Sequence, residues 1–283
     1  MLTNYTKLIA RAYREGWAIG AFNTSNLELT QAIVEAAEEL QSPVIVNTSE
    51  KAIEYAGLYE LTAIITTMAS QARVPVILNL DHGRSFEIAE RCLGVGYTAL
   101  MRDGSSLPFD MNVQETKRVV DLGHEASIGV EGEIGAIMGN EDFITGTPDM
   151  QYTDPKEAKR FVDRTGVDLL AVAVGTAHGR IKIEKLNFDV LRDIRKATDG
   201  TPLVLHGASG NKEKEISEAI KHGIAKINID TDLRYAFAER LRKNLEDNKS
   251  LYDPRGILGP AKDAVKERVK EYIVLFGSAG KAK

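Results

Sequence analysis

Residues 74–104 read VPVILNLDHGRSFEIAERCLGVGYTALMRDG, and this stretch contains the repeating unit that decides the fold. The apolar run at 74–80 predicts a buried strand, and a second apolar run follows at 97–102. Between them, the segment that begins at Phe86 carries apolar residues at helical spacing. The stretch therefore predicts a strand, a helix and a second strand in close succession.

The same alternation continues along the chain. Further apolar runs that predict strands lie at 17–23, 43–48, 127–132, 167–174, 202–206 and 224–229. Strand and helix alternating eight times predict an α/β protein of the (β/α)8 TIM barrel class, whose site forms at the carboxyl ends of the strands. We expect an N-terminal helix at 3–15 and a C-terminal helical extension at about 260–276 to flank the barrel.

The chain of 283 residues is predicted to form a single domain, 1–283, because no linker or low-complexity tract interrupts the alternation. An open doubly wound sheet is the rival arrangement. Against it, AFNTSN stands at 21–26, where a dinucleotide-binding sheet would carry Gly-x-Gly-x-x-Gly. The longest irregular stretch is 135–155, and we interpret it as a lid because loops of this length are more often functional than accidental.

Composition narrows the class of partner and the compartment. The net charge of −5 argues against nucleic acid or an anionic membrane as the main partner, although it leaves room for a local phosphate pocket. Cys92 is the single cysteine, so an internal disulfide is excluded and a reducing compartment is expected. We find neither a signal peptide nor a run long enough to span a bilayer, and we expect the protein in the cytoplasm.

Three of the five histidines share one context, just past an apolar run: His82 in VILNLDHG, His178 in LLAVAVGTAHG and His206 in PLVLHG. Strand ends gather on one face of a barrel, so these imidazoles can converge on a metal ion, and zinc prefers such ligands. His124 and His222 precede the next strand at helix ends. There they complement the helix dipole on the opposite face, and we assign them no chemistry.

Acidic residues occupy other strand ends. Asp81 precedes His82, Asp103 follows the fourth strand, and Glu131 and Glu133 flank Gly132 in the fifth. Asp81 and His82 can both reach the pocket where the strand twist breaks down. Structural roles stay open beside the metal-site interpretation. Asp81 could cap the helix that starts near Ser85, the glutamates could pair with arginines, and Asp103 could form a turn.

The last two strand ends predict phosphate binding. HGASGN at 206–211 and NIDTD at 228–232 place small residues, hydroxyls and backbone N–H groups ahead of helices that begin near Lys212 and Asp232. Barrels frequently bind phosphate after strands seven and eight, where N–H groups and helix dipoles favour an anion. Gly207 and Gly210 could equally be turn formers.

Six separated motifs carry a family resemblance. In chain order they are LNLDHG, VEGEIG, GTAHG, LHGASG, KINIDTD and YDPR, and they extend over nearly the whole chain. Together they resemble the class II, zinc-dependent fructose-bisphosphate aldolases and their tagatose-bisphosphate relatives. The resemblance implies a (β/α)8 enzyme that reversibly joins dihydroxyacetone phosphate to glyceraldehyde 3-phosphate.

The resemblance implies catalytic and metal-binding roles. The residues that resemble zinc ligands are His82, His178 and His206. Those that resemble ligands of a second or alternate metal position are Asp103 and Glu133. Asp81 resembles the acid/base that handles the C4 hydroxyl proton. Glu141, in the long irregular stretch, resembles the carboxylate that moves the dihydroxyacetone phosphate proton.

The resemblance also implies how substrate is bound. The positions that resemble substrate-binding residues are Asn23, Ser49, Gly179, Gly207, Ala208, Ser209, Asn228, Ile229, Asp230, Thr231 and Arg255. The backbone around Gly179, Gly207 and Ser209 is similar to a monovalent-cation site for Na⁺ or K⁺. Arg255, in YDPR, resembles an arginine that reaches the second phosphate, often in a neighbouring subunit, so a homodimer or homotetramer is expected.

The implied chemistry agrees with the residue types. Breaking a carbon–carbon bond beside a carbonyl leaves an enediolate, whose charge a zinc ion acting as Lewis acid would stabilise. Asp81 would accept one proton and Glu141 would return one. Tagatose 1,6-bisphosphate, the C4 epimer of the fructose substrate, stays an alternative, although Asp230 within NIDTD resembles the fructose branch.

Three other hypotheses remain. A lysine-dependent aldolase would use Lys226 for a Schiff base. A metal-dependent hydrolase would use three histidines and an aspartate, but its His-x-His is missing at the first strand's end, where Phe22 and Asn23 stand. A non-catalytic partner subunit would keep the fold only for assembly, and the intact ligands and Asp81 argue against it.

Overall fold

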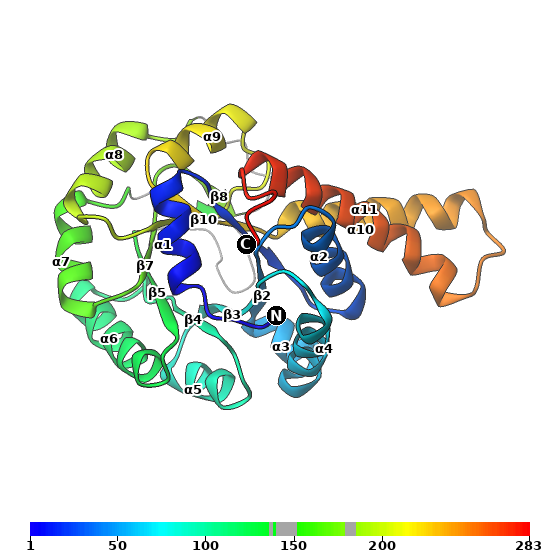
Figure 1. The fold of residues 1–283 in the computed structure, drawn as a ribbon, viewed down its shortest axis with the longest axis horizontal. Coiled ribbons are helices and arrows are strands. Elements are labelled where there is room, and N and C mark those ends of the chain that lie inside the picture. Colours follow the sequence, from blue (N-terminus) through cyan, green and yellow to red (C-terminus); the bar gives the residue numbers. More distant parts are fainter. Residues whose placement is uncertain (136–137, 140–151, 179–184) are drawn as a thin grey trace.

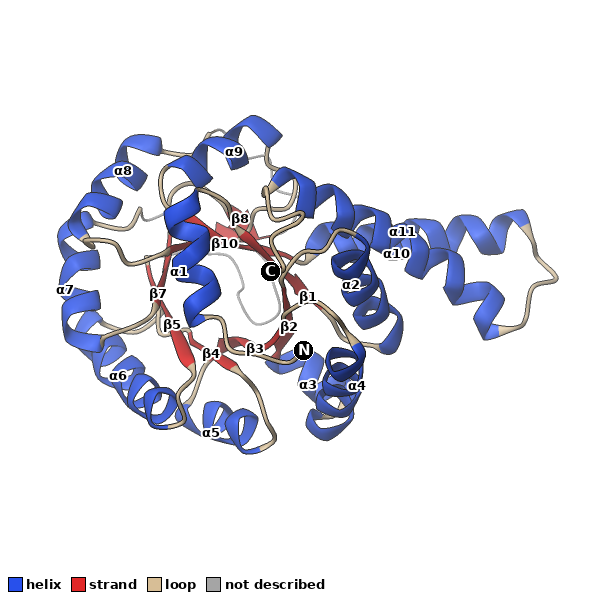
Figure 2. Cartoon of the chain, in the orientation of Figure 1, coloured by secondary structure: helices blue, strands red, loops and turns tan. Residues whose placement is uncertain are grey.

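Eight parallel strands close into a barrel in the computed structural model, which describes residues 1–135, 138–139, 152–178 and 185–283. Around the barrel the strand order is β1-β10-β9-β7-β5-β4-β3-β2, with helices outside it (Figures 1 and 2). The strands are β1 (Ile19–Asn23), β2 (Val44–Ser49), β3 (Val76–Gly83), β4 (Ala99–Arg102), β5 (Gly129–Ile134), β7 (Leu169–Val172), β9 (Leu203–Leu205) and β10 (Ile224–Ile229). The predicted (β/α)8 class is confirmed.

Helices follow the strands as the alternation predicts. They are α2 (Leu27–Glu39), α3 (Glu50–Ala56), α4 (Leu58–Gln71), α5 (Phe86–Gly94), α6 (Phe109–Glu125), α7 (Pro155–Thr165), α8 (Phe188–Ala197) and α9 (Glu213–Lys221). In several of these helices, the side chain of the N-cap residue accepts a hydrogen bond from a backbone N–H of the first turn. The Ser85 hydroxyl accepts the Ile88 N–H at the start of α5, for example, so this cap is not Asp81 as the structural alternative had it. The single helix expected between β2 and β3 is split at Gly57, whose φ is +88°.

Two short strands lie outside the barrel sheet. Met138–Gly139 (β6) pairs in parallel with Ala177–His178 (β8). This pairing joins the stretch expected as a lid to the segment that carries His178. Residues 136–137 and 140–151 of that stretch lie outside the described residues.

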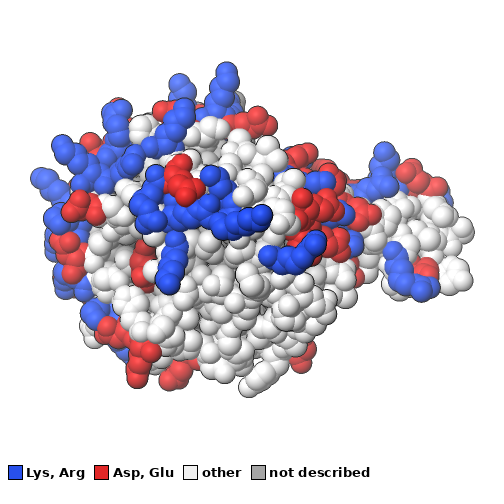
Figure 3. Space-filling view, viewed as in Figure 1, with Lys and Arg blue, Asp and Glu red and all other residues white. Residues whose placement is uncertain are grey.

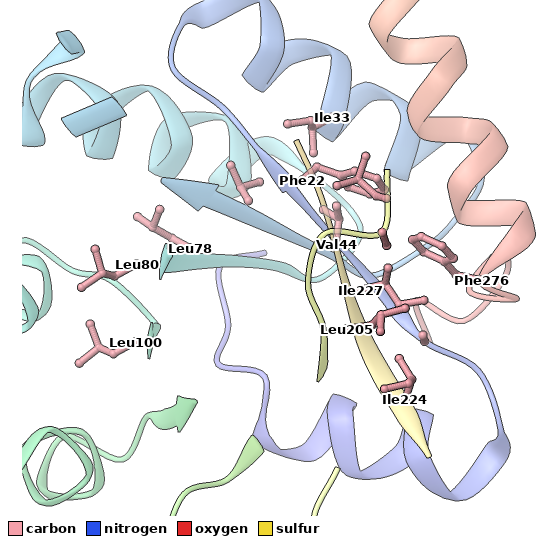
Figure 4. Close-up of a cluster of buried hydrophobic side chains, with 14 of the residues drawn as sticks. Phe22, Ile33, Val44, Leu78, Leu80, Leu100, Leu205, Ile224, Ile227 and Phe276 are labelled. Atoms are coloured by element: carbon pink, nitrogen blue, oxygen red, sulfur yellow. The ribbon is translucent and has the colours of Figure 1, made fainter. Parts of the chain in front are cut away.

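Apolar side chains pack on both faces of the barrel strands. One layer fills the space between strands and helices, and Figure 4 shows Phe22, Ile33, Ile227 and Phe276 among its side chains. A second cluster lies inside the barrel, where successive strands contribute alternate residues such as Ile19 and Ala21. Because both faces are buried, the strands appear in the sequence as nearly continuous apolar runs.

An N-terminal helix, α1 (Thr6–Glu15), covers the end of the barrel at which the strands begin (Figure 1). Tyr5 and Trp17 flank it and are buried with the interior cluster. We call Tyr5 and Trp17 the plug of this end. Gly129, at the start of β5, leaves the space for Tyr5, because a Cβ at Gly129 would lie 2.4 Å from the Tyr5 ring. The barrel is thus closed at this end by apolar side chains, and its open end is the other one.

The C-terminal extension is a pair of helices that projects from the barrel (Figure 1). It consists of α10 (Thr231–Asp247) and α11 (Pro254–Leu275). The second helix begins earlier than predicted because the Asp253 carboxylate caps it by accepting the Arg255 N–H. Where α11 packs on α2, Lys262 pairs with Glu35 at 3.0 Å.

On the face that carries α1, Lys and Arg side chains gather over that helix with acidic side chains among them, whereas the lower middle of this face is mostly uncharged (Figure 3). None of the helices that the structure describes combines the length and hydrophobicity needed to span a bilayer.

Truncating the Tyr5 side chain of the plug should destabilise the barrel. Tyr5 is fully buried, so we expect Tyr5→Ala to lower the free energy of unfolding by about 3–5 kcal/mol, as for other buried aromatic side chains. Tyr55 is 80% exposed, and Tyr55→Ala should change the same quantity by less than about 0.5 kcal/mol. Denaturant unfolding followed by circular dichroism measures both. Equal effects of the two substitutions would contradict the plug's role.

Candidate functional site

Polar side chains line the open end of the barrel, at the carboxyl ends of its strands. A pocket there is lined by Asn23, Asp81, His82, His206, Gly207, Ser209, Asn228, Asp230 and Thr231. A second recess beside it shares Asn23 and Asp230 and adds Ser49 and Arg234. The structure therefore brings together most of the predicted site residues that it describes.

His82 has an unusual backbone. It lies near the end of β3, where the pairing with β4 shifts register between Leu80 and Gly83. Its φ is +49°, in the left-handed region that non-glycine residues rarely adopt. Such strain is held in place by surrounding structure and often marks a functional position. With this backbone, both Asp81 and His82 line the pocket.

Two overlapping groups of side chains could hold a metal ion. Donor atoms of Asp81, His82 and His206 lie within 4.8 Å of one another, and so do donor atoms of His82, Asp103 and Glu133. His82 Nδ1 lies 2.8 Å from Asp103 Oδ2 and 3.6 Å from Glu133 Oε2. The backbone of His178 is in β8, and its side chain lies outside the described residues.

The donor set fits a divalent ion. Imidazole nitrogen and carboxylate oxygen are the ligands that zinc and its neighbours in the first transition row prefer. Two buried oxygens here, Glu133 Oε2 and Asn228 Oδ1, make no hydrogen bond with any described residue. Buried polar atoms are normally paired, so an ion or a substrate group is the expected partner at this place.

Close packing of charged groups shifts several pKa values. Burial by itself lowers the pKa of His82, but the carboxylates of Asp81 and Asp103 reverse this and raise that pKa well above its usual value. Burial raises the pKa of Glu133 strongly, and the Asp103 carboxylate adds to the effect. The pKa of Asp103 is low because its hydrogen bonds to His82 and Ser105 outweigh burial. A cation here would relieve this crowding of negative charge.

Asp103 forms a turn as well as contacting His82. Its Oδ1 accepts hydrogen bonds from the Ser105 N–H and hydroxyl. The turn predicted as its structural role is therefore present together with its contact to His82.

Asp81 is held by two amides. Asn23 Nδ2 donates to its Oδ2 at 2.8 Å, and Asn228 Nδ2 donates to its Oδ1 at 2.9 Å. Behind Asn23, Asn47 donates to Asn23 and Asn79 donates to Asn47, inside the barrel. Asn47 and Asn79 were missed in the sequence, although each interrupts an apolar strand run at an inward position. That interruption was the signal that could have revealed them.

The loop that follows β9 packs closely against the backbone of β8 in the same chain. Gly207 has a φ of +61°, and a Cβ there would lie 2.6 Å from the Ala177 carbonyl oxygen, so the position requires glycine. Ser209 lines the pocket beside Thr231, which begins α10. The backbone N–H groups of this helix start are suited to an anion. The side chains of Ala208 and Ile229 pack in the hydrophobic core, which leaves only their backbone for a ligand.

Among the described residues of the predicted site, Arg255 lies away from the pocket. Arg255 begins α11 at the far end of the projecting helices, where its side chain is 91% exposed and pairs with Asp253 at 2.7 Å (Figure 1). Glu141 and Gly179 lie outside the described residues.

A buried charge network lies beneath the pocket. Lys226 Nζ donates to Glu131 Oε2 at 2.6 Å, and His206 Nε2 contacts Glu131 Oε1 at 2.8 Å. Burial alone raises the pKa of Glu131, but the Lys226 ammonium and the His206 hydrogen bond lower it to about 2. Glu131 therefore pairs with a lysine and a histidine, and not with an arginine as the structural alternative had it. Lys226 is fully buried and ion-paired, which opposes its use as a Schiff-base lysine.

His124 and His222 lie at helix ends, as predicted. His124 is in the last turn of α6 and pairs with Asp168 at 2.9 Å, and His222 is the C-cap of α9.

Comparison with known proteins identifies relatives over the whole chain. The chain is 44% identical to a fructose-bisphosphate aldolase of Thermus caldophilus and 42% identical to one of Staphylococcus aureus, with 100% of this chain and at least 99% of each relative covered.

Solved structures agree with this result. The YdjI aldolase of Escherichia coli K12 superimposes with a TM-score of 0.89 at 38% identity over all of both chains. A putative fructose-1,6-bisphosphate aldolase of Coccidioides immitis gives 0.90 at 30% identity, covering 99% of this chain and 98% of that one.

The model of the family described as class II fructose-bisphosphate aldolase matches residues 3–281. Its extent is that of the barrel with both flanking helical parts, so the resemblance found in six short motifs holds along the full length. The chain belongs to the class II fructose-bisphosphate aldolase family.

Proposed function

We propose that this protein is a metal-dependent lyase that reversibly cleaves fructose 1,6-bisphosphate into dihydroxyacetone phosphate and glyceraldehyde 3-phosphate. The observation that carries the proposal is the convergence of Asp81, His82 and His206 within 4.8 Å at the open end of the barrel. The relatives' names support the substrate. The buried, unpaired Cys92 agrees with a protein of the cytoplasm.

In this proposal the metal is zinc, held by His82 and His206 with His178 as third ligand. Asp103 and Glu133 provide the second or alternate position beside His82. Zinc suits three nitrogen ligands with one position open for substrate. When bound, such an ion supplies an electrophile that offsets negative charge on substrate oxygen as the carbon–carbon bond breaks.

Asp81 accepts the proton of the C4 hydroxyl in the cleavage direction. Its carboxylate is oriented from both sides by the amides of Asn23 and Asn228, so the acceptor oxygen does not have to reorganise when substrate arrives. The proton that completes dihydroxyacetone phosphate comes from Glu141 in this proposal.

The phosphate of the dihydroxyacetone half binds after β9 and β10. Gly207, Ser209 and Thr231 contribute N–H and hydroxyl donors at the start of α10, where an anion is favoured. A monovalent cation, Na⁺ or K⁺, beside Gly207 and Ser209 would balance the added charge. Gly179 belongs to the same proposed subsite.

The second phosphate binds at the recess that contains Ser49. Arg255 is at the end of the projecting helices, far from its own pocket, so we propose that it serves the pocket of a neighbouring subunit in a homodimer or homotetramer.

Tagatose 1,6-bisphosphate is the second candidate substrate. It differs from the fructose compound only in configuration at C4, and one hydroxyl contact can decide between them. Asp230, held by Arg234 at 2.7 Å, lies at the pocket and favours the fructose epimer by its resemblance to that branch of the family.

Removing the metal should abolish cleavage. We expect purified protein to contain zinc by elemental analysis and to cleave fructose 1,6-bisphosphate faster than tagatose 1,6-bisphosphate. Activity should disappear on treatment with a chelator and return when a divalent ion is added. Cleavage that resists the chelator, or covalent trapping of substrate by borohydride, would contradict the metal mechanism in favour of a lysine-dependent one.

Replacing Asp81 should stop proton transfer without emptying the metal site. We expect Asp81→Ala to lower kcat by about 10²–10⁴-fold, the range for loss of a general acid/base, while zinc stays bound. Steady-state kinetics with metal analysis measure both. Asp121→Ala is the control, because that side chain is 62% exposed on α6. Full activity of Asp81→Ala would disprove the assignment.

Replacing Arg255 should weaken binding of the bisphosphate. Loss of a charge-assisted contact to phosphate should raise KM about tenfold or more and leave the metal content unchanged. Arg118→Ala, on the outer surface of α6, is the control. Analytical ultracentrifugation shows whether the active protein is an oligomer. A fully active monomer would exclude a role for Arg255 in a neighbour's pocket.

A further inference from the structure

Glu131 lies inside the barrel between a histidine of the proposed metal site and a lysine. Its Oε1 is 2.8 Å from His206 Nε2, and its Oε2 is 2.6 Å from Lys226 Nζ. The side chains of Glu131 and Lys226 are 0% exposed, and that of His206 is 1% exposed. Glu131 is in β5, His206 directly follows β9, and Lys226 is in β10.

Stability alone is a poor explanation for this arrangement. Taking an ammonium and a carboxylate out of water carries a large desolvation penalty, and well-packed apolar side chains of similar volume often stabilise a protein equally well or better. The strand neighbours of Lys226 include Ile19 and Val204, which are both apolar and buried. We therefore look for the role of the Lys226–Glu131 pair in its contact with His206.

Glu131 determines which nitrogen of His206 carries the proton. An ionised carboxylate only accepts hydrogen bonds, so Nε2 must carry a hydrogen, and in a neutral imidazole Nδ1 then holds the lone pair. His206 Nδ1 lies 3.2 Å from the donor Asn228 Nδ2, which agrees with an acceptor at that nitrogen. A donor atom of His206 also belongs to the group formed with Asp81 and His82.

Lys226 in turn determines how Glu131 is oriented. Both carboxylate oxygens are engaged, one by each partner, so the carboxylate cannot rotate away from His206 without breaking the ion pair. Lys226 does not line the pocket, and it thus acts on the pocket only through Glu131 and His206.

We propose that Lys226 and Glu131 are a positioning pair, which holds the His206 ring in one orientation and one tautomer so that Nδ1 faces the pocket and binds the metal. The inference deepens the proposed function and rests on its metal site. It assigns Lys226 a role other than Schiff-base chemistry and Glu131 a role that the motif resemblance did not assign.

The test is metal affinity and metal spectroscopy, with activity left aside. Metal-free protein is titrated with Co²⁺, whose visible absorption reports both the dissociation constant and the ligand geometry. We expect Glu131→Gln and Lys226→Met each to weaken Co²⁺ binding about 10–100-fold, the range for residues that orient metal ligands, and to change the absorption spectrum. Lys117→Met, which breaks an exposed ion pair with Asp121, should leave both unchanged.

The double variant Glu131→Gln/Lys226→Met separates positioning from folding. It leaves no uncompensated charge in the interior, and because the pair acts as a unit its loss of affinity should equal that of Glu131→Gln and fall short of the sum of both single losses. If Lys226→Met does not fold by circular dichroism, Glu131→Gln and the double variant alone decide the matter. An unchanged dissociation constant and spectrum in the folded variants, or losses that simply add, would overturn the proposal.

The parent protein distinguishes this inference from the proposed function. If it binds Co²⁺ and the variants bind it equally well, only the positioning pair is wrong. If it binds no divalent ion at the pocket, the proposed metal site itself fails and the inference fails with it.

Discussion

Every feature of the site depends on one geometric constraint, the alternation of side chains along strands that are closed into a barrel. Each second residue of a strand points toward the same narrow axis, and the others point toward the helices. The lower end of that axis is closed by Tyr5 and the apolar interior cluster. Polar residues at inward positions are therefore concentrated at the open end and just beneath it, and Asp81 and His206 meet there although they are far apart in the chain.

Burial of polar groups inside the barrel explains how the pocket is ordered. Buried donors and acceptors must be paired, and in this barrel the partners form chains that lead to the pocket. Amides inside β1 and β2 lead to Asp81 through Asn23, and the Lys226–Glu131 pair leads to His206. These two series of hydrogen bonds meet at Asn228, whose amide nitrogen contacts both Asp81 and His206. The pocket is thus supported from below by Asn47, Glu131 and Lys226, which do not line it.

Sequence patterns predicted the class of fold and much of the candidate site. Period-two and helical spacing are local properties, so the eight barrel strands were found with errors only at their ends, whereas the two-residue strands β6 and β8 were not predicted. His82 and His206 were identified because they repeat one position relative to a strand. Partner assignments were less accurate. The structural alternative paired Glu131 with an arginine, but its partner is Lys226, since a pairing between distant strands depends on barrel order and register, which a local pattern does not contain.

By itself, the sequence determined that strands and helices alternate, that strand ends carry metal-type ligands and that glycine-rich turns follow the last two strands, because these features are read from neighbouring residues. Only the tertiary structure decided that His82 takes a left-handed backbone, that Asp81 lies between two amides, and that Arg255 lies at the end of a projecting helix pair. The physical reason is that these properties arise from contacts between segments far apart in the chain. Burial and hydrogen bonding select among conformations that the local sequence leaves equally open.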